Sequence, residues 1–232
     1  MLKITVLIIM TVFTTPQTQA KECVILLHGL ARSESSMSKL SESLSNSGYV
    51  VVNQGYDSTQ HNIESLAMNV VPQALSQCIA GKKVHFVTHS MGGILLRYYT
   101  HYNDIENLGR VVMLGPPNKG SEVVDKLKNV PGFKWMNGPA GMQLGTSSDS
   151  LPNSLGPVTF DLGVIAGTRS VNLILSSYLP NPDDGKVSVQ STEIEGMNDH
   201  ISLPVTHTFM MRNKQVVEQV KYYLVHGFFR KV

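Results

Sequence analysis

A serine stands between an apolar run and two glycines in VHFVTHSMGG, residues 84–93. The apolar run predicts a buried strand, and residues 94–102 have the spacing of a helix. Ser90 would therefore lie on a sharp turn between strand and helix, with its hydroxyl directed out of the sheet. The N–H groups that open a helix have no acceptor within it, so they would face any negative charge that forms beside the serine. This arrangement suits nucleophilic attack on a carbonyl carbon.

The elements around Ser90 alternate between strands and helices. Apolar runs predict strands at residues 24–27, 49–53, 84–88, 111–114, 162–166 and 201–205. Helical spacing predicts the longer helices at residues 33–47, 63–79, 94–102 and 213–225. Alternation of this kind gives right-handed crossovers and a mostly parallel sheet with helices on both faces. The reactive surface of such a sheet lies at the carboxyl ends of its strands, where Ser90 stands.

One long segment, residues 128–159, departs from this alternation. It is rich in Gly, Pro, Ser and Asn, yet it carries Phe133, Trp135, Met136 and Leu144. A loop of this length in a compact domain is usually functional or disordered. Because apolar residues are embedded in it, we expect a small cap, inserted at about residues 129–158.

The first twenty residues have the features of a secretory signal peptide. Lys3 supplies a positive charge, residues 4–13 are apolar apart from threonines, and residues 18–20 resemble a small-residue cleavage site. The apolar run is too short for a membrane anchor, which needs about 20 residues. We therefore expect cleavage near Ala20, export to the periplasm or the medium, and one mature domain at residues 21–232.

Charge and cysteine content exclude several classes of function. The formal net charge is only +2 and basic residues are scattered, so nothing suggests a nucleic-acid partner. The two cysteines, Cys23 and Cys78, lack the spacing of metal ligands, so a zinc site is not expected. The sequence implies no metal and no organic cofactor.

Taken together, these motifs resemble those of an α/β-hydrolase of the bacterial lipase and esterase type. The family motif is G-x-S-x-G, and residues 88–92 match it except that Thr88 replaces the first glycine, whose role is packing. Residues 28–30, His-Gly-Leu, resemble the oxyanion loop, and residues 182–187 resemble the D-G-x-V acid loop. The resemblance runs from Val24 to the final helix and implies an α/β-hydrolase fold trimmed to about six strands.

The resemblance implies a catalytic triad of Ser90, Asp184 and His207, in the family's order along the chain. The acid directly precedes the glycine of its loop, which selects Asp184 and leaves Asp183 as the nearest rival. The family's base follows the last strand, which selects His207, whereas His200 lies before that strand. Asp184 would orient the imidazole and stabilise the imidazolium without taking a proton itself.

The resemblance also implies the remaining parts of the mechanism. The backbone N–H groups of Leu30 and Met91 would form the oxyanion hole. His207 would deprotonate Ser90, and water would resolve the acyl-enzyme. Apolar side chains of the cap would line an acyl-binding cleft. The expected substrate is therefore an acyl-lipid or other apolar ester; transient contact with a lipid surface is a further expectation, and no obligate protein partner is implied.

Two other classes of function share this pattern. Acyl transfer to an alcohol other than water, or cleavage of a thioester, would use the same residues. A catalytically dead binding protein on the same fold is the third possibility, and the presence of all three triad residue types in order argues against it.

The resemblance bears on the cysteines as well. Cys23 lies just before the first strand and Cys78 just before the strand that leads to Ser90. In the resembled fold these strands are parallel neighbours, so both cysteines fall at the same end of the sheet, away from the active site. In an oxidising compartment we predict a disulfide between them, with two free buried thiols as the alternative.

Overall fold

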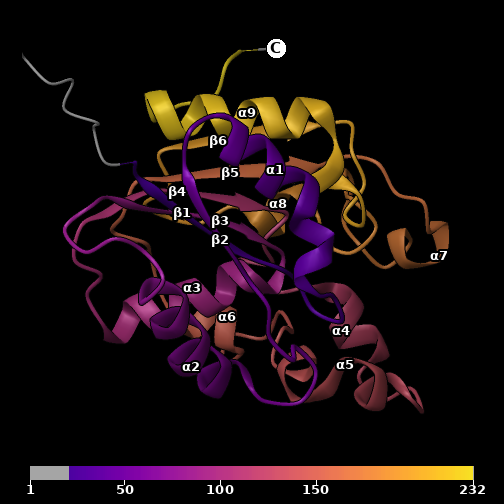
Figure 1. Cartoon of the computed structure of the whole chain (residues 1–232). Helices are drawn as coiled ribbons and strands as arrows, with labels where there is room; N and C mark the ends of the chain where they lie inside the picture. Colours follow the sequence, from indigo (N-terminus) through magenta and orange to yellow (C-terminus); the bar gives the residue numbers. More distant parts are fainter. Residues whose placement is uncertain (1–20, 232) are drawn as a thin grey trace, which may run out of the picture.

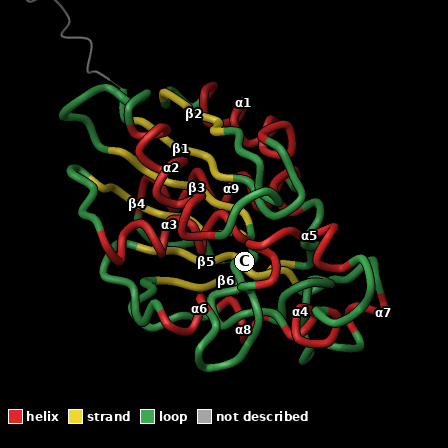
Figure 2. Tube along the Cα trace, turned by 90° about the horizontal axis from the view of Figure 1, so that it is seen from below, coloured by secondary structure: helices red, strands yellow, loops and turns green. Residues whose placement is uncertain are grey.

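The sheet predicted from the apolar runs is present in the computed structural model, which describes residues 21–231. Six parallel strands follow the order β2-β1-β3-β4-β5-β6 (Figure 2). Their bounds are β1 (Cys23–Leu27), β2 (Val50–Gln54), β3 (Val84–His89), β4 (Leu108–Leu114), β5 (Leu162–Gly167) and β6 (Asp199–Leu203). The predicted signal peptide, residues 1–20, lies outside the described residues.

Helices cover both faces of the sheet (Figure 1). One face carries α1 (Ser38–Asn46) and α9 (Lys214–His226), and the other carries α2 (Ile63–Leu75) and α3 (Met91–Tyr102). Successive side chains of a strand point to opposite faces. In β1, Val24 and Leu26 accordingly belong to one hydrophobic cluster and Ile25 and Leu27 to the other, all of them fully buried. The continuous apolar run in the sequence follows from this double coverage.

Some element ends differ from the prediction. A 3-10 turn, η1 (Glu34–Met37), precedes α1, and β6 begins two residues earlier than expected. Helix α2 ends at Leu75 rather than at residue 79. Beyond Leu75 the hydrogen bonds join residues three apart instead of four: the Gln77 N–H donates to Ala74 O and the Cys78 N–H to Leu75 O. The shorter elements are α4 (Glu122–Leu127), α5 (Phe133–Met142), α6 (Leu151–Ser154), α7 (Leu173–Ser176), α8 (Val189–Thr192) and η2 (Met210–Arg212).

The segment predicted as a cap packs into the body of the protein. Ala140, Leu144, Leu155 and Val158 are buried in the same cluster as α2 and α3. The side chain of Gln143 accepts a hydrogen bond from the backbone N–H of Ile63 at 2.7 Å, at the start of α2. This part of the chain is therefore integral to the hydrophobic core.

A buried cation holds the later part of the same segment. Arg97 of α3 is only 3% exposed, and its guanidinium donates to the backbone carbonyl oxygens of Asn118, Pro152 and Gly156, each at 3.0 Å. Burial lowers the pKa of Arg97 to about 10. By donating to these carbonyl oxygens, the Arg97 side chain fixes residues 152–156 against α3.

The predicted disulfide is confirmed, because Cys23 and Cys78 are joined across 55 residues of sequence. In the chain-entropy model, closing a loop of this length stabilises the fold by about 4 kcal/mol. We expect the double variant Cys23→Ser/Cys78→Ser to lose about this much free energy of unfolding, measured by urea titration of the oxidised proteins. Two titratable thiols in the denatured, unreduced parent would contradict the pairing.

Among residues 21–231, no helix has the length and apolar character that crossing a membrane requires. The same residues contain no group of three or more histidine, cysteine, aspartate or glutamate side chains placed to hold a metal ion.

Candidate active site

Ser90 lies on a strained turn between β3 and α3. Its φ is 53°, a value that non-glycine residues rarely adopt and that is often found at functional sites. The turn is held by the Ser90 N–H, which donates to Leu114 O at 2.8 Å. The helix approaches β1 so closely that a Cβ on Gly92 would stand 2.6 Å from Leu27 O. Only glycine fits at that position of the motif.

The replacement of the motif's first glycine by Thr88 is accommodated by a neighbouring glycine. Thr88 is fully buried, and its Oγ1 stands 3.2 Å from the point where a Cβ on Gly93 would lie. Gly93 therefore leaves the space that the threonine side chain occupies. The turn keeps its shape although the motif departs from the family pattern.

The structure brings the three predicted catalytic side chains together. Nε2 of His207 lies 3.0 Å from Ser90 Oγ, and Nδ1 of His207 lies 2.7 Å from Asp184 Oδ2. All three residues are buried, at 9% exposure or less. The backbone supports the pair, since His207 N–H donates to Asp184 O at 3.0 Å. A proton can pass between the serine and the imidazole, while the carboxylate fixes the orientation of the ring.

The two adjacent aspartates have different partners. Oδ1 of Asp184 accepts the N–H groups of Lys186 and Val187, which leaves Oδ2 for the histidine. Asp183 is also buried, but its carboxylate accepts the Gly185 N–H at 2.7 Å and the Ser176 hydroxyl at 2.5 Å. Asp183 therefore holds its own loop together and does not contact the imidazole.

His200, the rival for the base, is placed elsewhere. It is the second residue of β6, and its Nε2 lies 2.9 Å from Thr192 Oγ1. Burial lowers the pKa of His200 below its ordinary value. The structure does not bring this ring to Ser90.

His89 supports the site in a way that the sequence did not reveal. Its Nε2 donates to the backbone oxygen of His207 at 3.0 Å, and the two rings lie 4.8 Å apart. Burial above all, and then the charge of His207, lower the pKa of His89 well below its usual value. The ring is therefore neutral and fixes the backbone at His207. The one sequence feature that points to this role of His89 is its position directly before Ser90.

Three buried histidines make the stability depend on pH. His28, His85 and His89 are at most 2% exposed, and burial lowers the pKa of each in the folded state. Below about pH 6.5 the unfolded chain binds protons that the folded chain excludes, so stability falls as the pH falls. We expect each histidine to contribute at most about 1.4 kcal/mol per pH unit to the slope.

Urea unfolding at a series of values between about pH 7.5 and pH 5.5 measures this slope. His85→Gln should reduce this slope, because it removes one of the rings whose pKa burial lowers. A free energy of unfolding that stays constant across this range would contradict the prediction.

The predicted oxyanion loop is held from outside its own sequence. The Tyr56 hydroxyl donates to His28 O, and its ring stacks on that of His28 with 3.9 Å between centroids. The N–H of Ala31 donates to Ser58 Oγ at 3.0 Å. These contacts fix the loop that carries Leu30 beside the turn.

The two N–H groups predicted for the oxyanion hole have no competing acceptor. Met91 is the first residue of α3, so its N–H has no acceptor within the helix. Within residues 21–231, the N–H of Leu30 donates no hydrogen bond. Both groups are available to a negative charge beside Ser90.

An apolar cavity of about 310 Å³ opens onto Ser90 and His207. Its walls come mainly from the segment after β4. The apolar side chains that line it include Val124, Leu127, Phe133, Met136, Leu144 and Leu175. The predicted cap therefore contributes Phe133, Met136 and Leu144 to the surface that faces the reacting serine. An apolar acyl group fits the character of this lining.

Comparison with protein families gives one match. The model of the family described as palmitoyl protein thioesterase matches residues 23–155, which is more than half of the chain. Ser90 lies within the matched region, whereas Asp184 and His207 follow it. No curated protein sequence matches the chain significantly.

Solved structures with the same architecture include bacterial and metagenomic lipolytic enzymes. The mature lipase BlEst2 of Bacillus licheniformis superposes with a TM-score of 0.65 at 17% identity, over 89% of this chain and 93% of that one. A structure of the metagenome-derived enzymes LipS and LipT superposes with a TM-score of 0.61 at 15% identity, over 88% of this chain and 94% of that one. Phospholipase PlaB of Legionella pneumophila, in complex with thio-NAD, superposes with a TM-score of 0.60 at 20% identity, over 75% of this chain and 44% of PlaB. These likenesses confirm the predicted α/β-hydrolase fold.

Proposed function

The chain belongs to the palmitoyl protein thioesterase family, and we propose that it is a serine hydrolase that cleaves fatty acyl esters, thioesters included, through an acyl-enzyme on Ser90. The observation that carries the proposal is the hydrogen-bonded series from Ser90 through His207 to Asp184. The apolar cavity beside the serine supports the choice of a fatty acyl group.

In the proposed mechanism, Nε2 of His207 takes the proton from Ser90 Oγ as the oxygen bonds to the substrate carbonyl carbon. The N–H groups of Leu30 and Met91 stabilise the oxyanion that forms. The bond from carbon to the leaving oxygen or sulfur then breaks, and the leaving group takes the proton from His207. Water attacks the acyl-enzyme by the same steps in reverse, releasing the fatty acid and free Ser90. Asp184 stays ionised throughout.

A phosphonate ester that traps activated serines tests this proposal. It should label the mature protein at Ser90 and leave Ser90→Ala unlabelled. A series of p-nitrophenyl esters of increasing chain length measures the acyl preference, and we expect kcat/KM to rise with chain length because the cavity is apolar. A folded, intact protein that is neither labelled nor active on any ester would refute the proposal.

Among these substrates, the family whose model matches residues 23–155 favours thioesters. The same acyl group presented as an oxygen ester and as a thioester separates the two activities by their kcat/KM values. Added alcohols test for acyl transfer, because a transferase would form a new ester in place of free acid.

We further propose that the protein is exported after cleavage near Ala20. The disulfide between Cys23 and Cys78 supports this, because disulfides persist in oxidising compartments and are rare in the cytosol. Amino-terminal sequencing of the protein recovered outside the cytoplasm is the test, with Lys21 expected as the first residue.

Exposed apolar side chains on two helices that line the cavity support a transient contact with a lipid surface. On α5, Trp135 is 87% exposed and Met136 62%; on α7, Leu173 is 79% exposed and Ile174 71%. Both helices contribute to the cavity lining, so these exposed side chains would meet the lipid surface from which a fatty substrate is drawn.

Trp135 is the one tryptophan of the chain, so its fluorescence reports on this contact. We expect phosphatidylcholine vesicles to shift its emission to shorter wavelength, because the indole would leave water. Leu173→Ser should weaken the vesicle affinity that the titration gives, whereas Leu173→Ile should not. Emission that vesicles leave unchanged would contradict the contact.

A further inference from the structure

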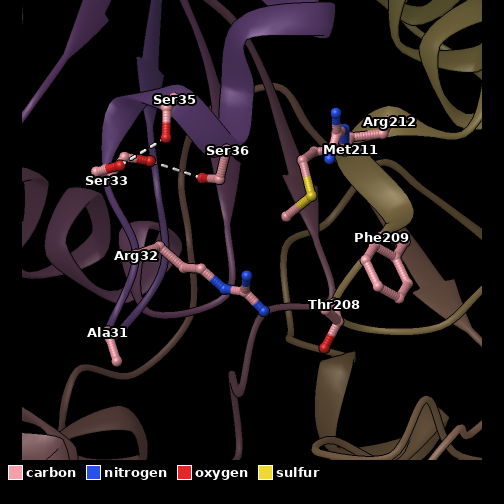
Figure 3. Close-up of a pocket in the computed structure, with 9 residues that line it drawn as sticks. All are labelled: Ala31, Arg32, Ser33, Ser35, Ser36, Thr208, Phe209, Met211 and Arg212. Atoms are coloured by element: carbon pink, nitrogen blue, oxygen red, sulfur yellow. Dashed lines mark hydrogen bonds between the residues drawn. The ribbon is translucent and has the colours of Figure 1, made fainter.

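A second cavity, of about 430 Å³, lies next to the proposed catalytic centre. One wall is the loop that runs from Ala31 into η1, and the other is the chain at η2 (Figure 3). The first wall begins directly after Leu30 and the second directly after His207, so the cavity adjoins the groups that act on the substrate. Arg32 lines both this cavity and the apolar one.

The lining of the second cavity is cationic and rich in hydroxyl groups. Arg32 extends from the first wall toward Thr208 on the second, and Arg212 belongs to the second wall (Figure 3). The hydroxyl groups come from Ser33, Ser35, Ser36 and Thr208. No aspartate or glutamate lines the cavity. The Ser36 hydroxyl donates to Ser33 O, and the hydroxyls of Ser33 and Ser35 bond to each other (Figure 3). The two guanidinium groups and the Thr208 hydroxyl are therefore the main donors that this lining offers to an anion.

Neither guanidinium is engaged elsewhere in the described part of the chain. The side chains of Arg32 and Arg212 make no hydrogen bond or ion pair within residues 21–231, in contrast to Arg97 and Arg110. Glu34, the acidic residue of the first wall, points away, since its Oε2 would lie 2.8 Å from a Cβ on Gly55. The two arginines therefore keep their full capacity to bind an anion.

The positive charge of Arg32 acts beside the reacting serine. The pKa of His89, the residue before Ser90, is lowered mainly by burial, and the charges of Arg32 and Lys186 lower it further. Lys186 lines the apolar cavity together with Arg32. A negative group on the substrate would thus be attracted toward Arg32, which lies between the two cavities.

We infer that the second cavity binds a phosphate group carried by the leaving group of the substrate. This inference rests on the proposed function. The acyl chain would occupy the apolar cavity, the carbonyl carbon would lie at Ser90, and the leaving group would extend past Arg32 toward Arg212. Guanidinium groups match phosphate oxygens in pairs, and the Thr208 hydroxyl can donate to an oxygen that remains. When the bond from the carbonyl carbon to the leaving oxygen or sulfur breaks, that atom takes the proton from His207, and the phosphate keeps its charge.

The substrate class is therefore a fatty acyl ester or thioester whose other half is phosphorylated. A lysophospholipid and an acyl-coenzyme A share this chemistry. Matched pairs distinguish them: lysophosphatidic acid against monoacylglycerol for esters, and acyl-coenzyme A against acyl-pantetheine for thioesters, all with the same acyl chain. The pair with the larger ratio of kcat/KM values, phosphorylated over unphosphorylated, identifies the source of the phosphate.

The test compares this ratio among the parent, Arg32→Gln and Arg212→Gln. Because the ratio is taken within one protein, general losses of activity cancel. For the parent, we expect the ratio to exceed about ten in at least one pair. In each arginine variant it should fall at least about tenfold, because a charge-assisted hydrogen bond to the phosphate is lost. Arg230→Gln is the matched control, since Arg230 lies over Tyr222 and lines neither cavity, and it should keep the parental ratio.

A ratio near one for the parent in both pairs, or one that neither arginine variant changes, would overturn the inference while leaving ester hydrolysis intact. Binding of glycerol 3-phosphate, measured by calorimetry, tests the cavity independently of catalysis. The affinity for glycerol 3-phosphate should be at least about tenfold lower in Arg212→Gln than in the parent or in Ser90→Ala. If the parent cleaves no ester yet binds glycerol 3-phosphate through Arg212, the proposed function fails and the anion site stands; equal affinity in Arg212→Gln would refute the site.

Discussion

Replacing Ser90 by alanine is expected to lower kcat for ester hydrolysis by roughly 10⁶-fold, and His207→Ala by a similar factor. The nucleophile and its base act as one unit, because Oγ of Ser90 is unreactive until Nε2 of His207, 3.0 Å away, takes its proton. The double variant should therefore be little worse than either single variant. Initial rates on one p-nitrophenyl ester, for variants shown to be folded by circular dichroism, measure the losses.

His200→Ala is the control for the base, because its ring contacts Thr192 and not the serine. It should keep most of the parental activity. Full hydrolysis by a folded Ser90→Ala protein would refute the whole proposal. Loss through His200 with activity retained in His207→Ala would overturn the choice of base alone.

The second large effect is expected at Asp184. Asp184→Asn should lower kcat by roughly 10⁴-fold, because an amide cannot stabilise the imidazolium and holds the ring in the wrong tautomer. The contact that is lost is the 2.7 Å hydrogen bond between Oδ2 and Nδ1 of His207. The pH dependence of kcat/KM for parent and variant measures both the loss and any change in the apparent ionisation of the base.

Asp183→Asn is the matched control, one residue away and equally buried. Its carboxylate accepts from Gly185 and Ser176, so the substitution should cost about 1–3 kcal/mol of stability with kcat nearly unchanged. A larger fall in kcat for Asp183→Asn than for Asp184→Asn would reverse the assignment.

The sequence predicted the parts of this fold that rest on local signals. The continuous apolar run at residues 24–27 identified a strand covered on both faces, and β1 is such a strand. The glycines after Ser90 identified the tight turn, and Gly92 does abut the backbone at Leu27. The positions of Asp184 and His207 came from resemblance to family motifs at the ends of strands. The structure places His207 against Ser90 and Asp184 against His207.

The contacts that hold the site together had no such local signal. The hydrogen bond from His89 to His207 spans 118 residues, and that from Ala31 to Ser58 spans 27. Neither pair follows a periodic pattern, because its geometry arises only when separate crossovers pack side by side. The packing of Leu144 into the core was hidden for the same reason, since apolar residues in a glycine-rich loop do not reveal what they cover.

The buried guanidinium of Arg97 has a consequence for how substrate enters. It ties residues 152–156 to α3, the helix that begins beside Ser90, and the side chain of Gln143 ties the end of α5 to α2. Segments held by buried hydrogen bonds open only together with much of the fold. Residues 143–156 therefore cannot swing away from the cleft as a lid, and the cavity at Ser90 is already formed in the resting protein. The rate should rise smoothly as a fatty ester passes its solubility limit, without the abrupt jump of a lipase whose lid must first be displaced by an oil surface.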